Sequence, residues 1–290
     1  MLGSVILDER FAPMAKTLLS TLRSWARARL REGREAIKLH HSCKLGVLGI
    51  MKNEAMNLDE WVEHHLWMGA DRIYLIDNGS TDDTLAKARA WVAKGRVRLV
   101  EYPERYQQVA HYRRAFQHFD IARHCEWLLV ADLDEFWFCP AGDTLVRALD
   151  EFDGYDVIYS NWVLFGSSGL IDHPPSVREG FTLRRPGVAG HNESKYIART
   201  SVLKNPRALG NHKVFGGNSA RTVTDTQRFQ LNHYIIQSEA FFRSVKMTRG
   251  ASDTILHEHV RTMEYFRRND EGCDVPDRKL ADLVAAARKR

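Results

Sequence analysis

Short apolar runs alternate with amphipathic segments from residue 44 onward, and this alternation is the strongest structural signal in the chain. Short apolar runs bounded by turn residues are typical of buried strands, whereas apolar positions spaced three and four apart are typical of helices. Strands that alternate with helices pair in parallel through right-handed crossovers, so the pattern predicts an α/β fold. The expected strands are 45–50, 72–76, 97–100 and 127–131, and the expected helices are 57–66, 81–94 and 110–123.

Polar residues at two turns predict how the helices after them begin. Asn57 is expected to cap the first helix, and Glu60, three positions later, would complete a capping box. Gly79 permits a tight turn after the second strand. Ser80 or Thr81 is then expected to cap the helix that follows.

The periodicity weakens after Pro140, and the second half of the chain carries shorter signals. Three prolines and several glycines in residues 172–192 predict a long loop or lid instead of regular structure. The other expected elements are a short helix at 144–152, strands at 157–163 and 194–199, a segment at 230–236 that carries His233, and helices at 239–249 and 276–290.

The fourth expected strand ends in an unusual cluster of acids, Asp132, Asp134 and Glu135, within the stretch WLLVADLDEFW. Buried carboxylates are costly unless they are paired or bound to a metal, so two alternate acids at the mouth of a strand suggest a divalent cation site. Alternation along an extended chain points Glu135 away from the other two. Glu135 is therefore not expected among the ligands.

Two further acids follow strand ends, namely Glu54 after the first strand and Asp77 after the second. Ligands of open parallel sheets bind outside the carboxyl ends of the strands, so these acids should converge with Asp132 and Asp134 on one edge. Taken singly, Glu54 could be a surface helix acid and Asp77 could form an Asx turn. Together, the four acids favour a functional site.

The positive charge of the chain is confined to its start. The net charge is +5, and residues 1–42 carry eight basic side chains against four acidic ones. A basic end on a nearly neutral body argues against a nucleic-acid groove and for an anionic membrane surface or an acidic partner. Residues 14–39 have the pattern of a basic amphipathic helix, which either packs on the domain or frays, or lies at a lipid interface.

No apolar run reaches the roughly 18 residues that a membrane span needs, and a signal-peptide pattern is missing from the start of the sequence. A cytoplasmic location is the default expectation, with peripheral contact on the inner face of the membrane through residues 14–39 as its extension.

Three motifs follow one another along the chain, namely KNE at 52–54, DNGSTDDT at 77–84 and DLDEF at 132–136. A lone DxD pattern is weak evidence, but a DxD at a strand end after the NGSTDDT turn is more specific. In this order the motifs resemble those of glycosyltransferases with the GT-A fold, specifically family-2-like enzymes close to the family 92 group. The later stretches FGSSG, SKYIAR, NHK and NHY are similar to that group too, and the resemblance covers about residues 44–250.

The resemblance implies a Rossmann-like mixed sheet, mostly parallel and flanked by helices. Residues 43–250 would form the GT-A domain, with a nucleotide-binding half at 43–140 and an acceptor half at 141–250. Residues 1–42 would then be the separate N-terminal helix, and residues 251–290 a helical C-terminal extension.

The resemblance also implies roles for individual residues toward a nucleotide sugar, with a UDP-hexose as the expected donor. Asp132 and Asp134 would hold Mn²⁺ or Mg²⁺ against the donor diphosphate, and His212 would complete the metal site, with His233 as its rival. Glu54 and Asp77 would contact the nucleoside. Lys246 and Arg249 would neutralise the leaving phosphate, unless they form a solvated helix face.

A divalent ion fixed by carboxylates stabilises the charge on a departing diphosphate as a Lewis acid. An inverting transfer to a hydroxyl also needs a base, for which Glu193 in the expected lid loop is the candidate. The pattern departs here from the common family-2 form, because HNES stands alone where that form carries paired acids.

The leading hypothesis is thus a metal-dependent, inverting glycosyltransferase of polysaccharide biosynthesis that acts on a glycan or lipid-linked acceptor. One alternative is a sugar-phosphate nucleotidyltransferase, which would want a glycine-rich basic loop after the first strand that GIMKNE does not supply. The other is a non-catalytic glycan- or nucleotide-binding module, against which the intact acids speak.

Overall fold

The computed structural model describes residues 41–190 and 193–289. The helix expected at 14–39 lies outside these residues. Shorter 3₁₀ turns occur at Leu149–Phe152, Thr200–Leu203, Pro206–Ala208, Ser219–Arg221 and Ile255–His257. The strands are β1 (Cys43–Met51), β2 (Arg72–Asp77), β3 (Val97–Glu101), β4 (Cys125–Val130), β5 (Glu135–Phe138), β6 (Val157–Leu164), β7 (Leu183–Arg184), β8 (Ser194–Arg199), β9 (Thr222–Thr224), β10 (Gln230–His233) and β11 (Val275–Pro276). The helices are α2 (Leu58–Trp67), α3 (Thr84–Ala93), α4 (Gln108–His118), α5 (Ile121–His124), α6 (Leu145–Ala148), α7 (Val177–Gly180), α8 (Glu239–Phe241), α9 (Met263–Asp270) and α10 (Lys279–Ala287).

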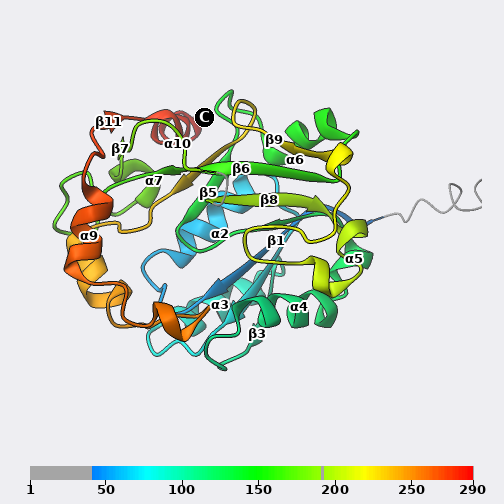
Figure 1. Cartoon of the computed structure of the whole chain (residues 1–290), viewed down its shortest axis with the longest axis horizontal. Helices are drawn as coiled ribbons and strands as arrows, with labels where there is room; N and C mark the ends of the chain where they lie inside the picture. The colour runs from blue at the N-terminus through cyan, green and yellow to red at the C-terminus, as the bar shows by residue number, and fades with distance from the viewer. Residues whose placement is uncertain (1–40, 191–192, 290) are drawn as a thin grey trace, which may run out of the picture. The chain divides into compact units, whose positions relative to one another are not determined.

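The described residues form a nine-stranded sheet in the order β3-β2-β1-β4-β8-β6-β10-β5, with β9 beside β6 (Figure 1). The strands β3, β2, β1 and β4 pair in parallel, as the alternation with helices predicts. Strand β8 runs antiparallel to both β4 and β6, and β5 runs antiparallel to β10. The expected α/β fold with a mixed, mostly parallel sheet is therefore confirmed.

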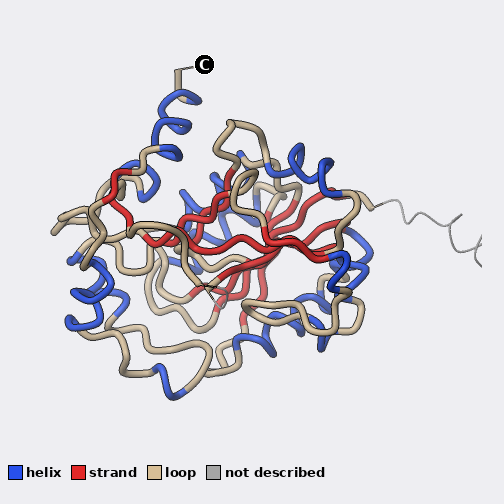
Figure 2. The backbone as a smooth tube through the Cα atoms, turned by 45° about the horizontal axis from the view of Figure 1, so that its top comes forward, coloured by secondary structure: helices blue, strands red, loops and turns tan. Residues whose placement is uncertain are grey.

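Helices cover both faces of the sheet (Figure 2). The central strand β1 is therefore apolar on both of its faces. Leu45 and Val47 belong to the apolar core under α2 and α3. Leu48 and Ile50 belong to the other core, which α4 covers. The strand ends are thereby fixed at one edge, where the polar loops after β1, β2 and β4 meet.

The capping prediction for α2 is wrong. Asn57 makes no side-chain cap bond to the helix; its amide instead donates to Glu54 and to Gln237, both at 3.1 Å. The Glu60 carboxylate accepts hydrogen bonds from the backbone N–H of Val177 at 2.6 Å and from the Arg178 guanidinium at 2.7 Å. Both side chains are recruited by segments more than a hundred residues away, which sequence spacing does not reveal.

The turn after β2 also uses its hydroxyls differently from the prediction. Helix α3 begins at Thr84, and neither Ser80 nor Thr81 caps it. Ser80 Oγ accepts from the Asn53 N–H at 3.1 Å, and Thr84 Oγ1 accepts from the Glu54 N–H at 2.7 Å. Because β1 and β2 are adjacent parallel strands, the two loops that follow them lie side by side and bond to each other.

Several elements are shorter or more broken than their sequence pattern. The helix expected at 110–123 is split into α4 and α5, with Asp120 between them in the left-handed region at φ 47°. The expected lid at 172–192 contains α7 and β7, and the helix expected at 239–249 is α8 followed by a π-helical turn, Phe242–Lys246. Residues 251–289 contain the helices α9 and α10 and also the strand β11, which pairs with β7.

Candidate active site

Asp132 and Asp134 of the DLDEF motif lie on the turn between β4 and β5, and Glu135 is the first residue of β5. The indole N–H of Trp61 in α2 holds this turn by donating to the carbonyl oxygens of Asp132 at 2.9 Å and Glu135 at 3.1 Å. The prediction that Glu135 points away from Asp132 is wrong, because its Oε2 accepts the Asp132 N–H at 2.9 Å. Strand alternation does not apply once the chain turns.

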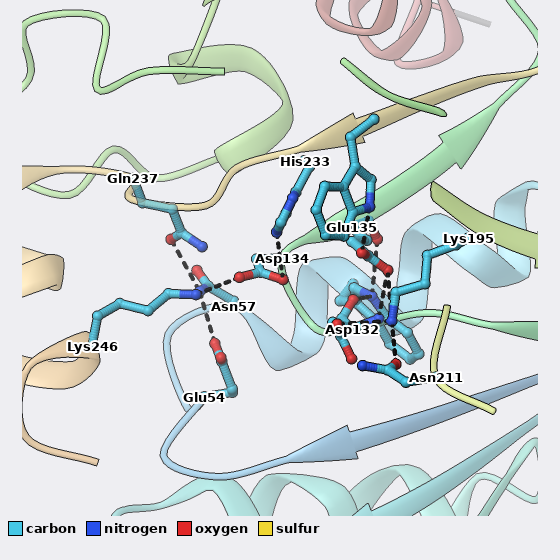
Figure 3. Close-up of polar contacts among 12 residues, drawn as sticks. Glu54, Asn57, Asp132, Asp134, Glu135, Lys195, Asn211, His233, Gln237 and Lys246 are labelled. Carbon is cyan, nitrogen blue, oxygen red and sulfur yellow. Dashed lines mark hydrogen bonds and ion pairs between the residues drawn. The ribbon is translucent and has the colours of Figure 1, made fainter. Parts of the chain in front are cut away.

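Asp132 belongs to a buried polar network on one side of this turn (Figure 3). Its Oδ2 lies 2.9 Å from the ammonium of Lys195, a side chain that is 0% exposed. Its Oδ1 accepts hydrogen bonds from Tyr112 at 3.1 Å and Gln108 at 3.3 Å. Burial would raise the pKa of Asp132, but the charge and hydrogen bond of Lys195, together with His212, hold that pKa below its usual value. Asp132 is therefore ionised and fixed in place.

Lys195 also serves Glu135, whose carboxylate lies 3.7 Å from the same ammonium. The Glu135 Oε1 accepts from the indole of Trp162 at 2.8 Å, and the Asn211 Oδ1 lies 2.5 Å from Lys195 Nζ. Burial raises the pKa of Glu135 to about 7, against the opposing effect of Lys195. One lysine thus balances two buried acids.

Asp134 faces the opposite way and pairs with Lys246, which approaches from the π-helical turn (Figure 3). Its Oδ1 lies 3.5 Å from Nε2 of His233, at the end of β10. Burial would raise the pKa of Asp134, but Lys246 and His233 hold it well below the usual value. The two acids of the motif are therefore held by different lysines on opposite sides.

Glu54 and Arg249, expected separately at the site, form an ion pair in the structure. Glu54 is 2% exposed, and its second oxygen accepts from the Asn57 amide. Since Lys246 and Arg249 both pair with acids, the alternative of a solvated helix face does not hold. Both cations belong to the wall of the cleft described below.

Asp77 lies at the expected edge, but its carboxylate faces its own turn. One oxygen accepts from the N–H groups of Gly79 and Ser80, both at 3.1 Å. That is the Asx-turn arrangement, and Gly79 has the positive φ of 77° that the turn requires. Its neighbour Asn78 lines the cleft instead, with its amide N–H₂ group held by the carbonyls of Tyr102 and Glu104.

His212 and His233 both contact the ring of Trp162, with centroid distances of 5.3 and 4.3 Å. Nδ1 of His212 lies 3.2 Å from the Ser194 carbonyl, and this contact assigns the ring hydrogen to Nδ1 and the lone pair to Nε2. Burial lowers the pKa of His212 to about 4, with Lys195 acting in the same direction. His212 is therefore a neutral imidazole whose orientation is fixed by a backbone carbonyl, as in many metal-ligating histidines.

One cleft of about 450 Å³ lies at the carboxyl edge of the sheet, and its lining includes Glu54, Asp132, Asp134 and both histidines. Its lining includes Glu193, the expected base, which lies just before β8. It also includes four cations, Lys52, Arg185, Arg261 and Arg268, that make no ion pair with a carboxylate in the part of the chain that the structure describes. Burial and the neighbouring Arg249 lower the pKa of Arg261, and burial together with Arg105 lowers that of Lys52. Crowded cations of this kind favour an anionic ligand.

The donor set fits a divalent cation. Carboxylate oxygens and the neutral imidazole of His212 are suitable ligands. The 3.5 Å between Asp134 Oδ1 and His233 Nε2 is a separation that two ligands of one ion can have. Within residues 41–190 and 193–289, no three His, Cys, Asp or Glu side chains are grouped so that they could hold a metal ion. A Mg²⁺-type site needs few ligands from the protein, because phosphates or water supply the rest.

Sequence reasoning missed the residues that neutralise and orient the acids. Lys195 sits inside SKYIAR, and Gln108, Tyr112 and Trp162 lie in segments assigned only structural roles. A usable signal existed for Lys195, because a lysine within a strand of otherwise apolar pattern must find an acidic partner if it is buried. The partner itself, 63 residues away, was not deducible.

The sequence profile described as glycosyltransferase family 92 matches residues 48–268. This match covers about three quarters of the chain and includes every residue of the cleft except Asn269. The chain belongs to glycosyltransferase family 92. The predicted family resemblance and GT-A fold are thereby confirmed.

Curated relatives of this family 92 chain are substantially longer. A glycosyltransferase family 92 protein of Ricinus communis is 27% identical over 271 residues, which cover 85% of this chain and 47% of the relative. Galactan beta-1,4-galactosyltransferase of Arabidopsis thaliana is 27% identical over 221 residues, which cover 73% of this chain and 38% of the relative. The chain thus spans less than half the length of these relatives.

Solved structures similar to the family 92 chain include TarS residues 1–349 of S. aureus, with a TM-score of 0.44 and 15% identity over 69% of this chain and 62% of that chain. Glucosyl-3-phosphoglycerate synthase of Mycobacterium tuberculosis, solved with Mn²⁺ and UDP-glucose, has a TM-score of 0.34 and 13% identity over 63% of this chain and 68% of that chain.

None of the helices that the structure describes combines the length and apolar character of a membrane span.

Proposed function

We propose that this protein transfers a hexose from a UDP-sugar to a hydroxyl of a glycan or lipid-linked acceptor, with a divalent cation and inversion at the anomeric carbon. The observation that carries the proposal is the cleft of this family 92 chain. Asp132, Asp134 and Glu54 line it together with cations that have no carboxylate partner, at the carboxyl edge of the sheet. The galactan galactosyltransferase among the relatives supports a glycan acceptor. A role in polysaccharide biosynthesis is part of the same proposal.

The charge pattern of the cleft supports a nucleoside diphosphate as the donor group. Lys246 and Arg249 are already matched by acids, so the unpaired Lys52, Arg261 and Arg268 are the groups left to meet the phosphates. Asn78, at the end of β2, offers a fixed amide to the nucleoside. Asp77 and Glu54 would act indirectly. Asp77 holds the turn after β2, and Glu54 holds Arg249.

The bound Mn²⁺ or Mg²⁺ would take one or two ligands from Asp132, Asp134 and the two histidines, with the diphosphate and water as the others, and would supply Lewis-acid stabilisation of the leaving diphosphate. In the transfer, the bond from the anomeric carbon to the diphosphate oxygen breaks and a bond to the acceptor oxygen forms. The acceptor proton passes to the carboxylate of Glu193, and the negative charge stays on the nucleoside diphosphate. The unpaired Lys52, Arg261 and Arg268 stabilise that charge electrostatically.

The Glu193→Gln variant is expected to lose about a hundredfold or more in transfer rate, because the amide cannot accept the acceptor proton. Donor affinity should stay unchanged, since Glu193 makes no contact with the cations of the donor side. Transfer is measured with radiolabelled donor, and nucleotide affinity by calorimetry with UDP. A variant that retained the full transfer rate would remove Glu193 as the base.

A donor panel tests the function as a whole. The protein is incubated with nucleotide sugars and Mn²⁺ or Mg²⁺, and release of free nucleoside diphosphate is measured with and without chelator. Metal-dependent release supports the proposal. Pyrophosphate release from a sugar phosphate and a nucleoside triphosphate would instead support a nucleotidyltransferase, and binding without any turnover would support a non-catalytic module.

We also propose a cytoplasmic location with peripheral contact of residues 14–39 on the anionic inner face of the membrane. The support is the basic amphipathic pattern of the sequence. Sedimentation with phosphatidylserine-containing liposomes should fall when residues 1–42 are removed, and should fall with added salt. Equal sedimentation of both forms would refute the contact.

A further inference from the structure

A second cavity, of about 710 Å³, adjoins the cleft and shares Asn211 and His212 with it. It lies over β6, β8 and β9 and is closed on one side by the start of α4 and by residues 209–215. None of the residue roles derived above uses it. Its remaining lining is Val109, Arg113, Tyr159, Asn161, Ser194, Gly210, Lys213, Phe215, Thr222 and Thr224.

The lining combines aromatic rings with neutral polar groups. Phe215 is 46% exposed, which is unusual for a phenyl ring, and Tyr159 lies on the same cavity wall. Thr224 of β9 supplies a hydroxyl group. Asn161 of β6 and Thr222 supply acceptor oxygens, because the Asn161 N–H₂ group already donates to the carbonyls of Ala189 and Gly190, and the Thr222 hydroxyl donates to that of Asn218. A sugar ring presents apolar C–H faces and a rim of hydroxyls, and this combination of rings and neutral hydrogen-bonding groups matches it.

Other ligand classes fit this lining less well. A nucleoside diphosphate needs several free cations, but the Arg113 guanidinium already donates to the carbonyls of Leu209 and Arg207, and Lys213 stacks 5.1 Å from the Phe215 ring. A lipid chain needs a continuous apolar wall, which the threonines and Asn161 interrupt. The cavity is thus complementary to a neutral saccharide.

The wall that carries Phe215 is built rigidly. Tyr159 accepts the Val214 N–H at 2.9 Å, and Tyr196 donates to the Gly210 carbonyl at 2.7 Å. A Cβ on Gly210 would meet the Phe215 ring at 2.7 Å and a backbone oxygen at 2.6 Å, so this close approach requires glycine. A preorganised ring loses little entropy when a ligand stacks on it.

The cavity leads to the proposed base. Ser194 lines the second cavity, whereas Glu193, its chain neighbour, lines the first. His212 lies at the boundary, held by the Ser194 carbonyl. A chain bound in the second cavity can therefore present its terminal hydroxyl at Glu193 while the donor occupies the cleft.

We propose that the second cavity binds the saccharide chain of the acceptor, with a sugar ring against Phe215 and hydroxyls at Thr222, Thr224 and Asn161. This inference rests on the proposed function and specifies its acceptor as an oligosaccharide that is recognised beyond its terminal unit.

The test compares donor hydrolysis without acceptor with transfer to β-1,4-galacto-oligosaccharides of increasing length and to a panel of other neutral oligosaccharides. In Phe215→Ala, KM for long oligosaccharides should rise about tenfold, since an aromatic contact contributes on the order of 1 kcal/mol or more. Donor hydrolysis should stay unchanged. Phe215→Tyr should restore the KM. Ile171→Ala, which truncates an exposed apolar side chain elsewhere, should leave it unchanged.

Each outcome decides a different question. Unchanged KM in Phe215→Ala, or transfer by the wild-type protein to none of the oligosaccharides despite metal-dependent donor hydrolysis, overturns the acceptor site and leaves the glycosyltransferase function intact. Absence of donor hydrolysis in the wild-type protein overturns the proposed function itself.

Discussion

Asp134→Asn is expected to reduce metal-dependent nucleotide release by about 10³-fold, as removal of one preorganised electrostatic group at a reacting centre typically does. The asparagine keeps the shape of the side chain but loses the charge that Lys246 and His233 now balance. Mn²⁺ affinity, measured by titration with paramagnetic detection, should fall in the same variant. Activity and metal binding are thus separate readouts of one substitution.

The same variant leaves Lys246 buried without its carboxylate, and Lys246 is 2% exposed. Loss of one partner of a buried pair costs about 3–5 kcal/mol of stability. The double variant Asp134→Asn with Lys246→Gln removes both charges and should recover much of the free energy of unfolding without recovering activity. Recovery of activity in the double variant would contradict a direct role of Asp134 in catalysis.

Lys195→Met is expected to lower the free energy of unfolding by about 3–5 kcal/mol, because it leaves the buried Glu135 and the partly buried Asp132 without a counter-charge. Urea denaturation followed by tryptophan fluorescence measures the loss. The matched control is Lys204→Met at an exposed position, which should change stability by no more than about 0.5 kcal/mol.

The stability deficit of Lys195→Met should shrink as the pH falls. Burial already raises the pKa of Glu135 to about 7, and loss of the Lys195 charge removes the main effect that opposes burial. Acids whose folded pKa lies above the unfolded value bind protons preferentially in the folded state, so stability rises as the pH falls through the folded pKa. Adding Glu135→Gln should likewise recover part of the loss, and a pH-independent deficit would argue against this electrostatic origin.

The parallel half of the sheet was predictable because β1, β2 and β4 each contain a continuous run of apolar residues and glycines. Strands β1 and β4 are buried on both faces, so their sequences differ sharply from the polar loops between them. The elements of the second half of the chain were harder to predict from the sequence. Short elements such as β7 and the π-helical turn Phe242–Lys246 depend on contacts with distant segments and carry no periodic signal of their own.

The site divides in the same way. The positions of Glu54, Asp132 and Asp134 follow from strand ends, which the sequence marks with acids after apolar runs. Their partners do not, since Lys195 and Lys246 reach the acids from segments 63 and 112 residues away. Glu135 was misassigned because the chain turns at 131–134, and the hydrogen bonds that impose the turn come from Trp61 in α2.

Because β8 runs antiparallel to β4, changes in the donor-side loops and changes in the segment before β8 affect different parts of the chain. Loops on the donor side follow the ends of β1, β2 and β4, whereas the segment that leads into β8 reaches the same edge from the start of a strand. Substitutions or length changes before Ser194 therefore alter the proposed acceptor side without disturbing the chain that carries the acids. Donor and acceptor preference can accordingly diverge independently, and exchange of the segment before β8 between relatives should move the acceptor preference alone.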